Sequence, residues 1–301
     1  MKAFDLIGNT PLVLLEHYST DNVKIFAKLE SYNLGGSIKD RLGKHLIEHA
    51  LAEGNIHSGD TIVEATAGNT GIGLAIVANH YNINCVIFAP EGFSEEKMNI
   101  MKALGAEVRR TPRSEGMLGA RQQAQTYSEE YGGYYINQFE NEENPQAYVH
   151  TLATEILEQC PDITHLIAGA GSGGTFTGIA SVMKEHQVRN IIVEPEGSIL
   201  AGGETHAHDT EGIGVEKWPP FLKRDLIDDI KVISDRDAFT NVSGLALNEG
   251  ILAGSSSGAA LQAAIDLSKQ IEQGHIVVIF PDGSDRYMSK NIFNYGGKHY
   301  E

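Results

Sequence analysis

The sequence has little cysteine and fewer basic than acidic residues. Two cysteines, Cys85 and Cys160, stand among 301 residues, which is too few for a disulfide framework or a cysteine-based zinc cluster. Lysine and arginine total 23 against 40 aspartate and glutamate residues, so the formal net charge is -17. A surface of this charge repels nucleic acid and anionic membranes, and we therefore expect neither as a partner.

Long apolar runs and an export leader are also missing. No apolar run comes near the roughly 18 residues of a membrane-spanning helix. Met1 is followed almost at once by FDLIGNTPL (4–12), which has the pattern of folded chain and not of a leader. With 41% hydrophobic and 21% charged residues, the composition is that of a soluble globular protein. We expect a cytoplasmic location.

Short β-branched runs alternate with longer helical patterns along the whole chain. The expected strands are 23–29, 61–65, 84–89, 163–168, 190–194 and 275–280. The expected helices are 40–53, 70–80, 94–104, 117–131, 146–159, 174–186, 236–248 and 257–272. This alternation predicts an α/β fold with parallel sheets covered by helices. A chain of this length is at the upper limit of a single core, so two lobes are expected.

Three turns rich in small residues precede helical patterns. They read TIVEATAGNTG (61–71), LIAGAGSGGTFTG (166–178) and GILAGSSSGAA (250–260). Ligands of parallel α/β folds bind beyond the carboxyl ends of strands, so these turns are candidate binding segments. Residues 197–228 form a long irregular connection, which is often functional. His206 and His208 lie in it, but no third ligand accompanies them, which favours solvated histidines over a metal site.

Each turn has a chemical interpretation and a structural one. The glycines of 171–175 can expose backbone N–H groups to a phosphate at a helix N-terminus, or they can serve tight helix–strand packing. Thr66, Asn69 and Thr70 suit a carboxylate, although such residues also cap helices. The serines at 255–257 are typical of an N-cap, and Gln138 follows an apolar, aromatic stretch.

Lys39 lies between a loop of small residues and a helical pattern, in LGGSIKDRLG (34–43). Taken alone it is a lysine at a helix start. A buried lysine with a lowered pKa can also form a Schiff base with an aldehyde. An aldehyde-bearing phosphorylated cofactor needs such a lysine and a phosphate-binding turn, and pyridoxal phosphate meets both conditions.

The full set of motifs resembles the cysteine synthase and cystathionine β-synthase family, and most of all stand-alone bacterial cystathionine β-synthases. These are pyridoxal-phosphate enzymes of fold type II, similar to the tryptophan synthase β-chain. The motifs occur in the family's order along almost the whole chain. They are IGNTPL (7–12), GGSIKDR (35–41), TAGNTG (66–71), KALGAEV (102–108), QFENEENP (138–145), GSGGT (171–175), GSSSG (254–258) and PDGSDRY (281–287).

The resemblance implies a role for each motif. Lys39 would form the Schiff base and later remove the substrate Cα proton, Asn69 would bond the cofactor's 3-hydroxyl oxygen, and Ser256 would meet its pyridine nitrogen. The phosphate would be held by Gly171, Ser172, Gly173, Gly174 and Thr175. The substrate carboxylate would be held by Thr66, Ala67, Gly68, Asn69, Thr70 and Gln138. Ala67 stands where the family usually has serine, so one hydroxyl is missing.

The resemblance also implies an architecture. The smaller lobe would span 38–140 and the larger lobe 1–37 plus 141–301, with the cofactor between them. The enzyme would be a homodimer without haem that acts on small amino acids. Docking of a serine acetyltransferase, which some relatives perform, stays open.

The implied reaction is β-replacement through a bound aminoacrylate, to which a thiol or sulfide adds. VEPEGSIL (193–200), EGIG (211–214) and GAEVRRTP (105–112) resemble cystathionine β-synthases, although Val215 stands where a tyrosine often follows. The hypothesis is therefore transsulfuration in amino-acid biosynthesis, in which O-acetylserine (or serine) and homocysteine give cystathionine. Glu211 and Gly212 would lie near the amino group of the incoming substrate. The alternatives are cysteine synthesis from O-acetylserine and sulfide, a dehydratase of the same fold, and a catalytically silent relative that binds a metabolite or partner.

Overall fold

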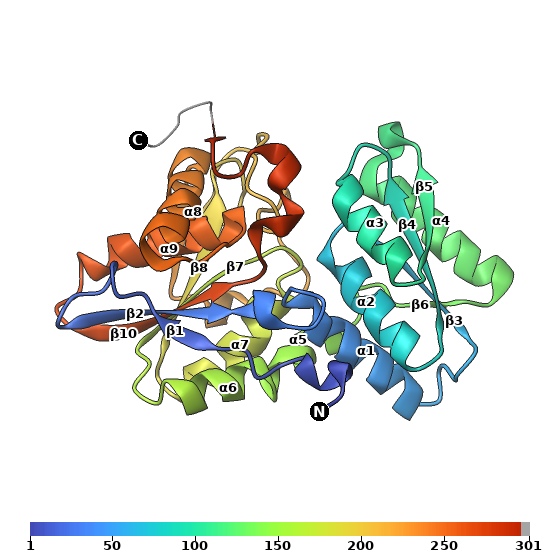
Figure 1. Ribbon diagram of the computed structural model, residues 1–301, viewed down its shortest axis with the longest axis horizontal. Helices are drawn as coiled ribbons and strands as arrows, with labels where there is room; N and C mark the ends of the chain where they lie inside the picture. The colour runs from blue at the N-terminus through green and yellow to red at the C-terminus, as the bar shows by residue number, and fades with distance from the viewer. Residues whose placement is uncertain (296–301) are drawn as a thin grey trace. The chain divides into compact units, whose positions relative to one another are not determined.

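The computed structural model describes residues 1–295 and divides into two compact units (Figure 1). Unit 1 comprises Met1–Gly8 and Asn33–Ala147, and unit 2 comprises Asn9–Tyr32 and the chain from Tyr148 onward. Strands and helices alternate in both units, which confirms the α/β class with parallel-rich sheets. The assignment of 38–140 and of 1–37 plus 141–301 to two cofactor-binding lobes stays a prediction.

Unit 1 is built on a parallel sheet in the order β5-β4-β3-β6. Its strands are β3 (Thr61–Ala65), β4 (Asn84–Pro90), β5 (Glu107–Thr111) and β6 (Tyr134–Tyr135). Its helices are α1 (Lys39–Ala52), α2 (Asn69–His80), α3 (Glu95–Ala103), α4 (Gly116–Tyr131) and most of α5 (Glu143–Val149), whose last two residues belong to unit 2. Helix α4 packs on one face of the sheet (Figure 1), where Ala120 and Ala124 form an apolar cluster with Val63 and Ala65 of β3 and with Val86 and Phe88 of β4.

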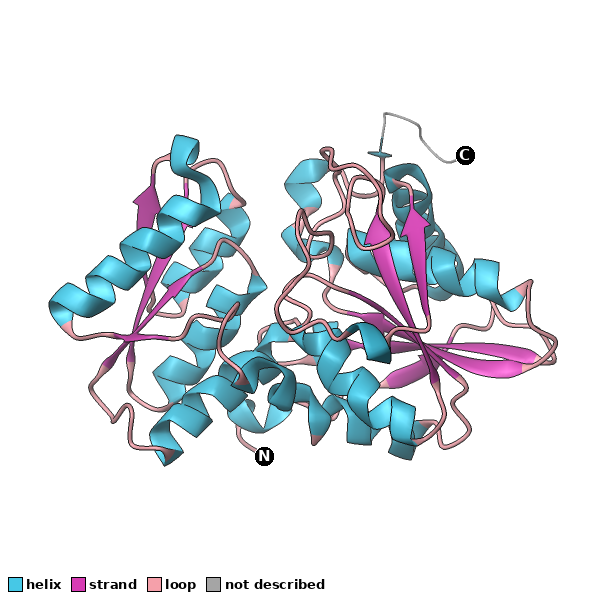
Figure 2. Cartoon of the chain, turned by 180° about the vertical axis from the view of Figure 1, so that it is seen from behind, coloured by secondary structure: helices cyan, strands magenta, loops and turns pink. Residues whose placement is uncertain are grey.

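Unit 2 is built on a mixed sheet in the order β1-β2-β10-β7-β8-β9, in which the β1–β2 pair is antiparallel and the other pairs are parallel. The strands are β1 (Leu12–Leu14), β2 (Val23–Leu29), β7 (His165–Gly169), β8 (Arg189–Pro195), β9 (Asp229–Ile233) and β10 (Gly274–Phe280). The helices are α6 (Leu152–Gln159), α7 (Gly174–Glu185), α8 (Asp235–Glu249) and α9 (Ser255–Ser268). Figure 1 places α8 and α9 on one face of this sheet and α6 and α7 on the other, and Figure 2 shows the same layers from behind.

The expected elements are confirmed with one exception. The segment 146–159 was expected to form one helix, but the structure has α5 and α6 with a break between them. Thr151 has φ -121° and ψ -89°, outside the helical region, so the backbone hydrogen-bond ladder cannot run through it. Strands β1, β5, β6 and β9 were not foreseen because they are short or carry charged residues, as in EVRRT (107–111).

The connection expected at 197–228 is irregular in the structure. Between β8 and β9 it forms only a short 3-10 turn, Arg224–Leu226. Among residues 1–295, no helix is both long enough and apolar enough to cross a bilayer.

Both cysteines are buried free thiols. Burial raises the pKa of Cys85, inside β4, to about 12, and raises that of Cys160, just after α6, to about 11.

Helices α1 and α2 touch through their backbones at two glycines. A Cβ added to Gly73 would lie 2.5 Å from the carbonyl oxygen of Lys39, and one added to Gly43 would lie 2.7 Å from the carbonyl carbon of Gly73. Helices with ordinary side chains at the contact are 8–10 Å apart, so glycine permits a closer approach here. The contact fixes the first residue of α1, Lys39, against the first turns of α2.

Replacing Gly73 with alanine should destabilise unit 1. The higher helix propensity of alanine alone would stabilise the variant by about 1 kcal/mol. The new Cβ, however, would clash with the backbone carbonyl of Lys39, which cannot rotate away as a side chain can. We expect a net loss of about 1–3 kcal/mol in the free energy of unfolding, measured by urea denaturation. Gly68→Ala, just before α2, is the control, because Gly68 has φ -122° and the nearest atom to a Cβ there, Thr66 Oγ1, lies 4.0 Å away. Equal stability of the two variants would contradict the contact.

Candidate active-site segments

The TAGNT turn in unit 1 connects the end of β3 to the start of α2. The hydroxyl oxygen of Thr66 accepts a hydrogen bond from the N–H of Gly68 at 3.2 Å. The hydroxyl of Thr70 donates to Oε1 of Gln138 at 2.8 Å, and both residues are buried. The structure therefore joins two predicted carboxylate-binding segments that lie 68 positions apart in the sequence.

Lys39 and Asn69 are the first residues of α1 and α2, and both side chains are only partly buried. The loop before Lys39 folds back on the helix start, because the N–H of Gly35 donates to the carboxylate of Asp40 and the N–H of Lys39 donates to Ser37 Oγ at 3.2 Å. A Cβ on Gly35 would lie 2.3 Å from Ile76 Cδ1. The small residues around Lys39 thus serve close packing of its loop on α2.

The glycine-rich loop in unit 2 joins β7 to α7. Gly173 is the N-cap of α7 and has φ 83°, a left-handed conformation that favours glycine. The EGIG segment (211–214) lies against this loop. Gly214 N–H donates to Ala170 O at 3.1 Å, and a Cβ on Gly171 would lie 3.0 Å from Gly212 O.

This loop has the properties of a phosphate-binding site. The backbone N–H groups of Gly173, Gly174 and Thr175 are at the N-terminus of a 12-residue helix, where the dipole favours an anion. No acidic residue occurs between Ala170 and Thr177. Ser172 and Thr175 are partly exposed hydroxyl donors. The residues present therefore fit a phosphorylated cofactor.

The serine turn in unit 2 begins α9 and contacts EGIG directly. Ser255 Oγ accepts a hydrogen bond from the N–H of Glu211 at 3.0 Å, and the carboxylate of Glu211 forms an ion pair with Lys290. Ser256 is the next residue and is 6% exposed. Unit 2 thus brings the glycine-rich loop, EGIG and the serine turn together. The pairing of Glu211 with Lys290 could not be predicted from the sequence. Lys290 follows the PDGSDRY motif (281–287), and nothing in that segment indicates Glu211 as its partner.

A buried carboxylate, Glu64, precedes the TAGNT turn and was not foreseen. It is fully buried in β3, and its oxygens accept hydrogen bonds from the N–H of Ala65 at 2.7 Å and of Gln138 at 3.0 Å. Burial raises the pKa of Glu64 to about 7, against the lowering effect of these bonds and of Arg121 on α4. Cys85 on β4 and Tyr135 on β6 also lie within its electrostatic reach. The only sequence signal is an acidic residue inside the strand TIVEA.

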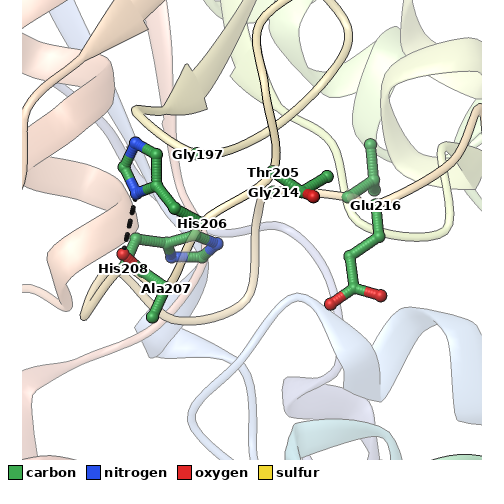
Figure 3. Close-up of a pocket in the computed structure, with 8 residues that line it drawn as sticks. Gly197, Thr205, His206, Ala207, His208, Gly214 and Glu216 are labelled. Atoms are coloured by element: carbon green, nitrogen blue, oxygen red, sulfur yellow. Dashed lines mark hydrogen bonds between the residues drawn. The ribbon is translucent and has the colours of Figure 1, made fainter.

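The histidines of the irregular connection line a cavity of about 430 Å³ in unit 2 (Figure 3). His206 and His208 lie on one side of it and Glu216 lies on the other. Nδ1 of His206 is 3.0 Å from the carbonyl oxygen of Ala207, and Nδ1 of His208 is 2.9 Å from that of Thr210. Within residues 1–295, no group of three potential metal ligands is close enough to hold an ion.

Comparison with known proteins decides the family. A family model described as pyridoxal-phosphate dependent enzyme matches residues 3–282. This chain is a pyridoxal-phosphate-dependent enzyme. The membership confirms the resemblance drawn from the motifs, and it names the phosphorylated cofactor that the loop of unit 2 fits.

The proteins similar to this pyridoxal-phosphate enzyme include both cystathionine β-synthases and cysteine synthases. An O-acetylserine dependent cystathionine β-synthase of Bacillus subtilis is 50% identical over 97% of both chains. A cysteine synthase of Helicobacter pylori is 48% identical over 96% of this chain and 97% of its own. The crystal structure of an O-acetylserine dependent cystathionine β-synthase from Helicobacter pylori has a TM-score of 0.92 and 46% identity, over 97% of this chain and 98% of that one.

The raised pKa of Glu64 predicts a pH-dependent stability. An exposed carboxyl titrates at 4.5 and the folded one at about 7, so between these values the folded state binds a proton that the unfolded state lacks. The contribution of Glu64 to the unfolding free energy is therefore largest at low pH and falls by about 3 kcal/mol as the pH rises through this window. The difference in urea stability between the native protein and Glu64→Gln should change across pH 5–8. A difference that is constant with pH would contradict the assignment.

Proposed function

We propose that the protein catalyses β-replacement on O-acetylserine with homocysteine and so forms cystathionine. The 50% identity to an O-acetylserine dependent cystathionine β-synthase over 97% of the chain carries this proposal. Serine is the second candidate for the first substrate. A homodimer in the cytoplasm, with no haem, completes the proposal.

Unit 1 would bind the first substrate and move its proton. Thr66, Ala67, Gly68, Asn69 and Thr70 would present backbone N–H groups to the substrate carboxylate. Thr66 would add its hydroxyl, whereas the hydroxyl of Thr70 already donates to Gln138. With its Oε1 occupied by Thr70, the amide of Gln138 keeps its N–H donors for the same anion. Lys39 would hold the cofactor aldehyde and then, as a free amine, remove the substrate Cα proton as general base. Ala67 supplies only its backbone N–H, because it lacks the serine hydroxyl common in the family.

Unit 2 would hold the cofactor. Residues Gly171, Ser172, Gly173, Gly174 and Thr175 would bind its phosphate, and Ser256 would face its pyridine nitrogen, while Asn69 of unit 1 would bond the 3-hydroxyl oxygen. Bound pyridoxal phosphate supplies an electron sink for the negative charge that develops when the Cα proton leaves. Ser256 would offer a hydroxyl and not a carboxylate at the pyridine nitrogen, and a hydroxyl would not keep that nitrogen protonated.

The Glu211–Lys290 pair supports an amino acid as the second substrate. Homocysteine carries an ammonium and a carboxylate beside its thiol, whereas sulfide carries neither. Glu211 is held at its backbone by Ser255 and offers a negative charge, and Lys290 offers a positive one. Two opposite charges beside the serine turn match the two ends of an amino-acid head group. Because Gly171 has no side chain, the carbonyl of Gly212 in EGIG can lie close to the glycine-rich loop.

Cysteine synthesis from O-acetylserine and sulfide is the second candidate, because a cysteine synthase is 48% identical over 96% of the chain. The two reactions share every step up to addition of the sulfur nucleophile. A catalytically silent relative is disfavoured by the joint presence of Lys39, Asn69 and Ser256. A dehydratase is disfavoured by QFENEENP and EGIG.

A competition experiment separates the two candidate products. The purified holoenzyme receives O-acetylserine with homocysteine and sulfide at equal, modest concentrations, and mass spectrometry identifies the products. We expect cystathionine to dominate, because the charges of Glu211 and Lys290 favour an amino acid. Dominance of cysteine would assign the protein as a cysteine synthase, and absence of both products would argue against β-replacement altogether.

Replacing Lys39 with alanine tests the catalytic amine. The native protein should be yellow, and its visible spectrum should shift when O-acetylserine is added. Lys39→Ala should lose the Schiff-base absorption and turnover, because no other group supplies the amine. Lys44→Ala, five residues further along α1 and partly exposed, is the matched control and should keep both. Substantial turnover in Lys39→Ala would contradict its role.

A further inference from the structure

The carboxylate of Glu64 joins two backbone segments at the end of β3. Its Oε1 accepts from the N–H of Ala65, the last residue of the strand, and its Oε2 accepts from the N–H of Gln138. The bridge therefore connects the strand that leads into the TAGNT turn with the segment that carries Gln138. Both ends of the bridge lie in unit 1.

The sheet leaves a gap that this carboxylate fills. Strand β6 pairs with β3 at only two positions, Ile62 with Tyr134 and Val63 with Tyr135. One further bond follows, from Ile136 N–H to Val63 O at 3.0 Å. Beyond it the two segments no longer pair directly, and a backbone N–H left there without an acceptor would be costly.

A buried carboxylate is an expensive way to satisfy two N–H groups. Its charge must leave water, whereas a backbone carbonyl of a longer β6 could accept such bonds without that cost. Perturbed, buried ionisable groups gather at functional sites. The position of Glu64, directly before the TAGNT turn and bonded to Gln138, points to a function at this site.

Gln138 is held at three points around its backbone and side chain. Glu64 accepts from its N–H, Asn144 Nδ2 donates to its carbonyl oxygen at 2.6 Å, and Thr70 donates to its Oε1 at 2.8 Å. Within the described chain, its Nε2 amide has no hydrogen-bond partner, so two N–H donors remain for a ligand. An amide fixed in this way is pre-organised for an anion.

We propose that Glu64 is a positioning residue for the substrate carboxylate: by bridging Ala65 and Gln138 it fixes the Gln138 amide at the correct spacing from the TAGNT turn. The inference rests on the proposed function, in which Gln138 and residues 66–70 bind that carboxylate. Glu64 itself touches neither substrate nor cofactor in this role. Its effect is therefore on substrate affinity and not on the chemical step.

Glu64→Gln tests the bridge with almost no change in size. The new NH2 group faces one of the two N–H donors, so one bridging bond is lost. We expect the KM for O-acetylserine to rise about tenfold, with kcat within about twofold of native. The dissociation constant of L-alanine, which has no leaving group, should rise equally in a spectral titration of the holoenzyme. Glu130→Gln, an exposed change in the same unit, is the control and should leave both constants unchanged.

A double-mutant cycle distinguishes positioning from general destabilisation. If Glu64 acts through Gln138, the double variant Glu64→Gln, Gln138→Ala should have the same KM as Gln138→Ala alone. The proposal would be overturned if the KM increase of the double variant equalled the product of the two single increases. It would also be overturned if Glu64→Gln lowered kcat and left KM at its native value. Glu64→Asp is the second variant should Glu64→Gln fail to fold: its shorter carboxylate cannot span both N–H groups, and a native KM in it would also overturn the proposal.

The native protein and Glu130→Gln test the proposed reaction independently of the role of Glu64. If neither responds to O-acetylserine, the proposed reaction fails. If both respond normally and the Glu64 variants respond just as well, the reaction stands and only the positioning role fails.

Discussion

Backbone contact between α1 and α2 is the constraint on which unit 1 depends. Gly43 and Gly73 remove the side chains that would otherwise separate two helices. Because the contact involves the carbonyl of Lys39 itself, the position of the lysine is set by backbone and not by a flexible neighbour. Unit 2 uses the same device where Gly171 meets the carbonyl of Gly212. In both units, glycine brings one candidate segment within van der Waals distance of another.

The sequence was informative where the local pattern and the fold agree. Strand, small-residue turn and helix follow one another at TIVEATAGNTG and at LIAGAGSGGTFTG, and the structure has a strand end and a helix start at those places. Such segments are readable because strand periodicity, turn chemistry and capping are all local properties. The family followed from the order of the motifs and is confirmed by the match over residues 3–282.

The sequence was uninformative where a residue's role depends on a distant partner. Glu64 reads as one acidic residue in a strand, and its importance appears only when Gln138 is seen to donate to it. The break between α5 and α6 depends on the backbone of Thr151, whose residue type is tolerated within helices. Lys290 became relevant only through its ion pair with Glu211, 79 positions away. Long-range pairings of this kind leave no periodic signal in one sequence.

The burial of both cysteines has a consequence for selectivity. A thiol reacts as its thiolate, and the pKa values of about 12 for Cys85 and about 11 for Cys160 keep both protonated at neutral pH. Neither side chain can compete with a sulfur nucleophile from solution, and neither is a ready target for mixed disulfides with small thiols. A protein proposed to act on thiols thus has two cysteine thiols that are themselves unreactive at neutral pH.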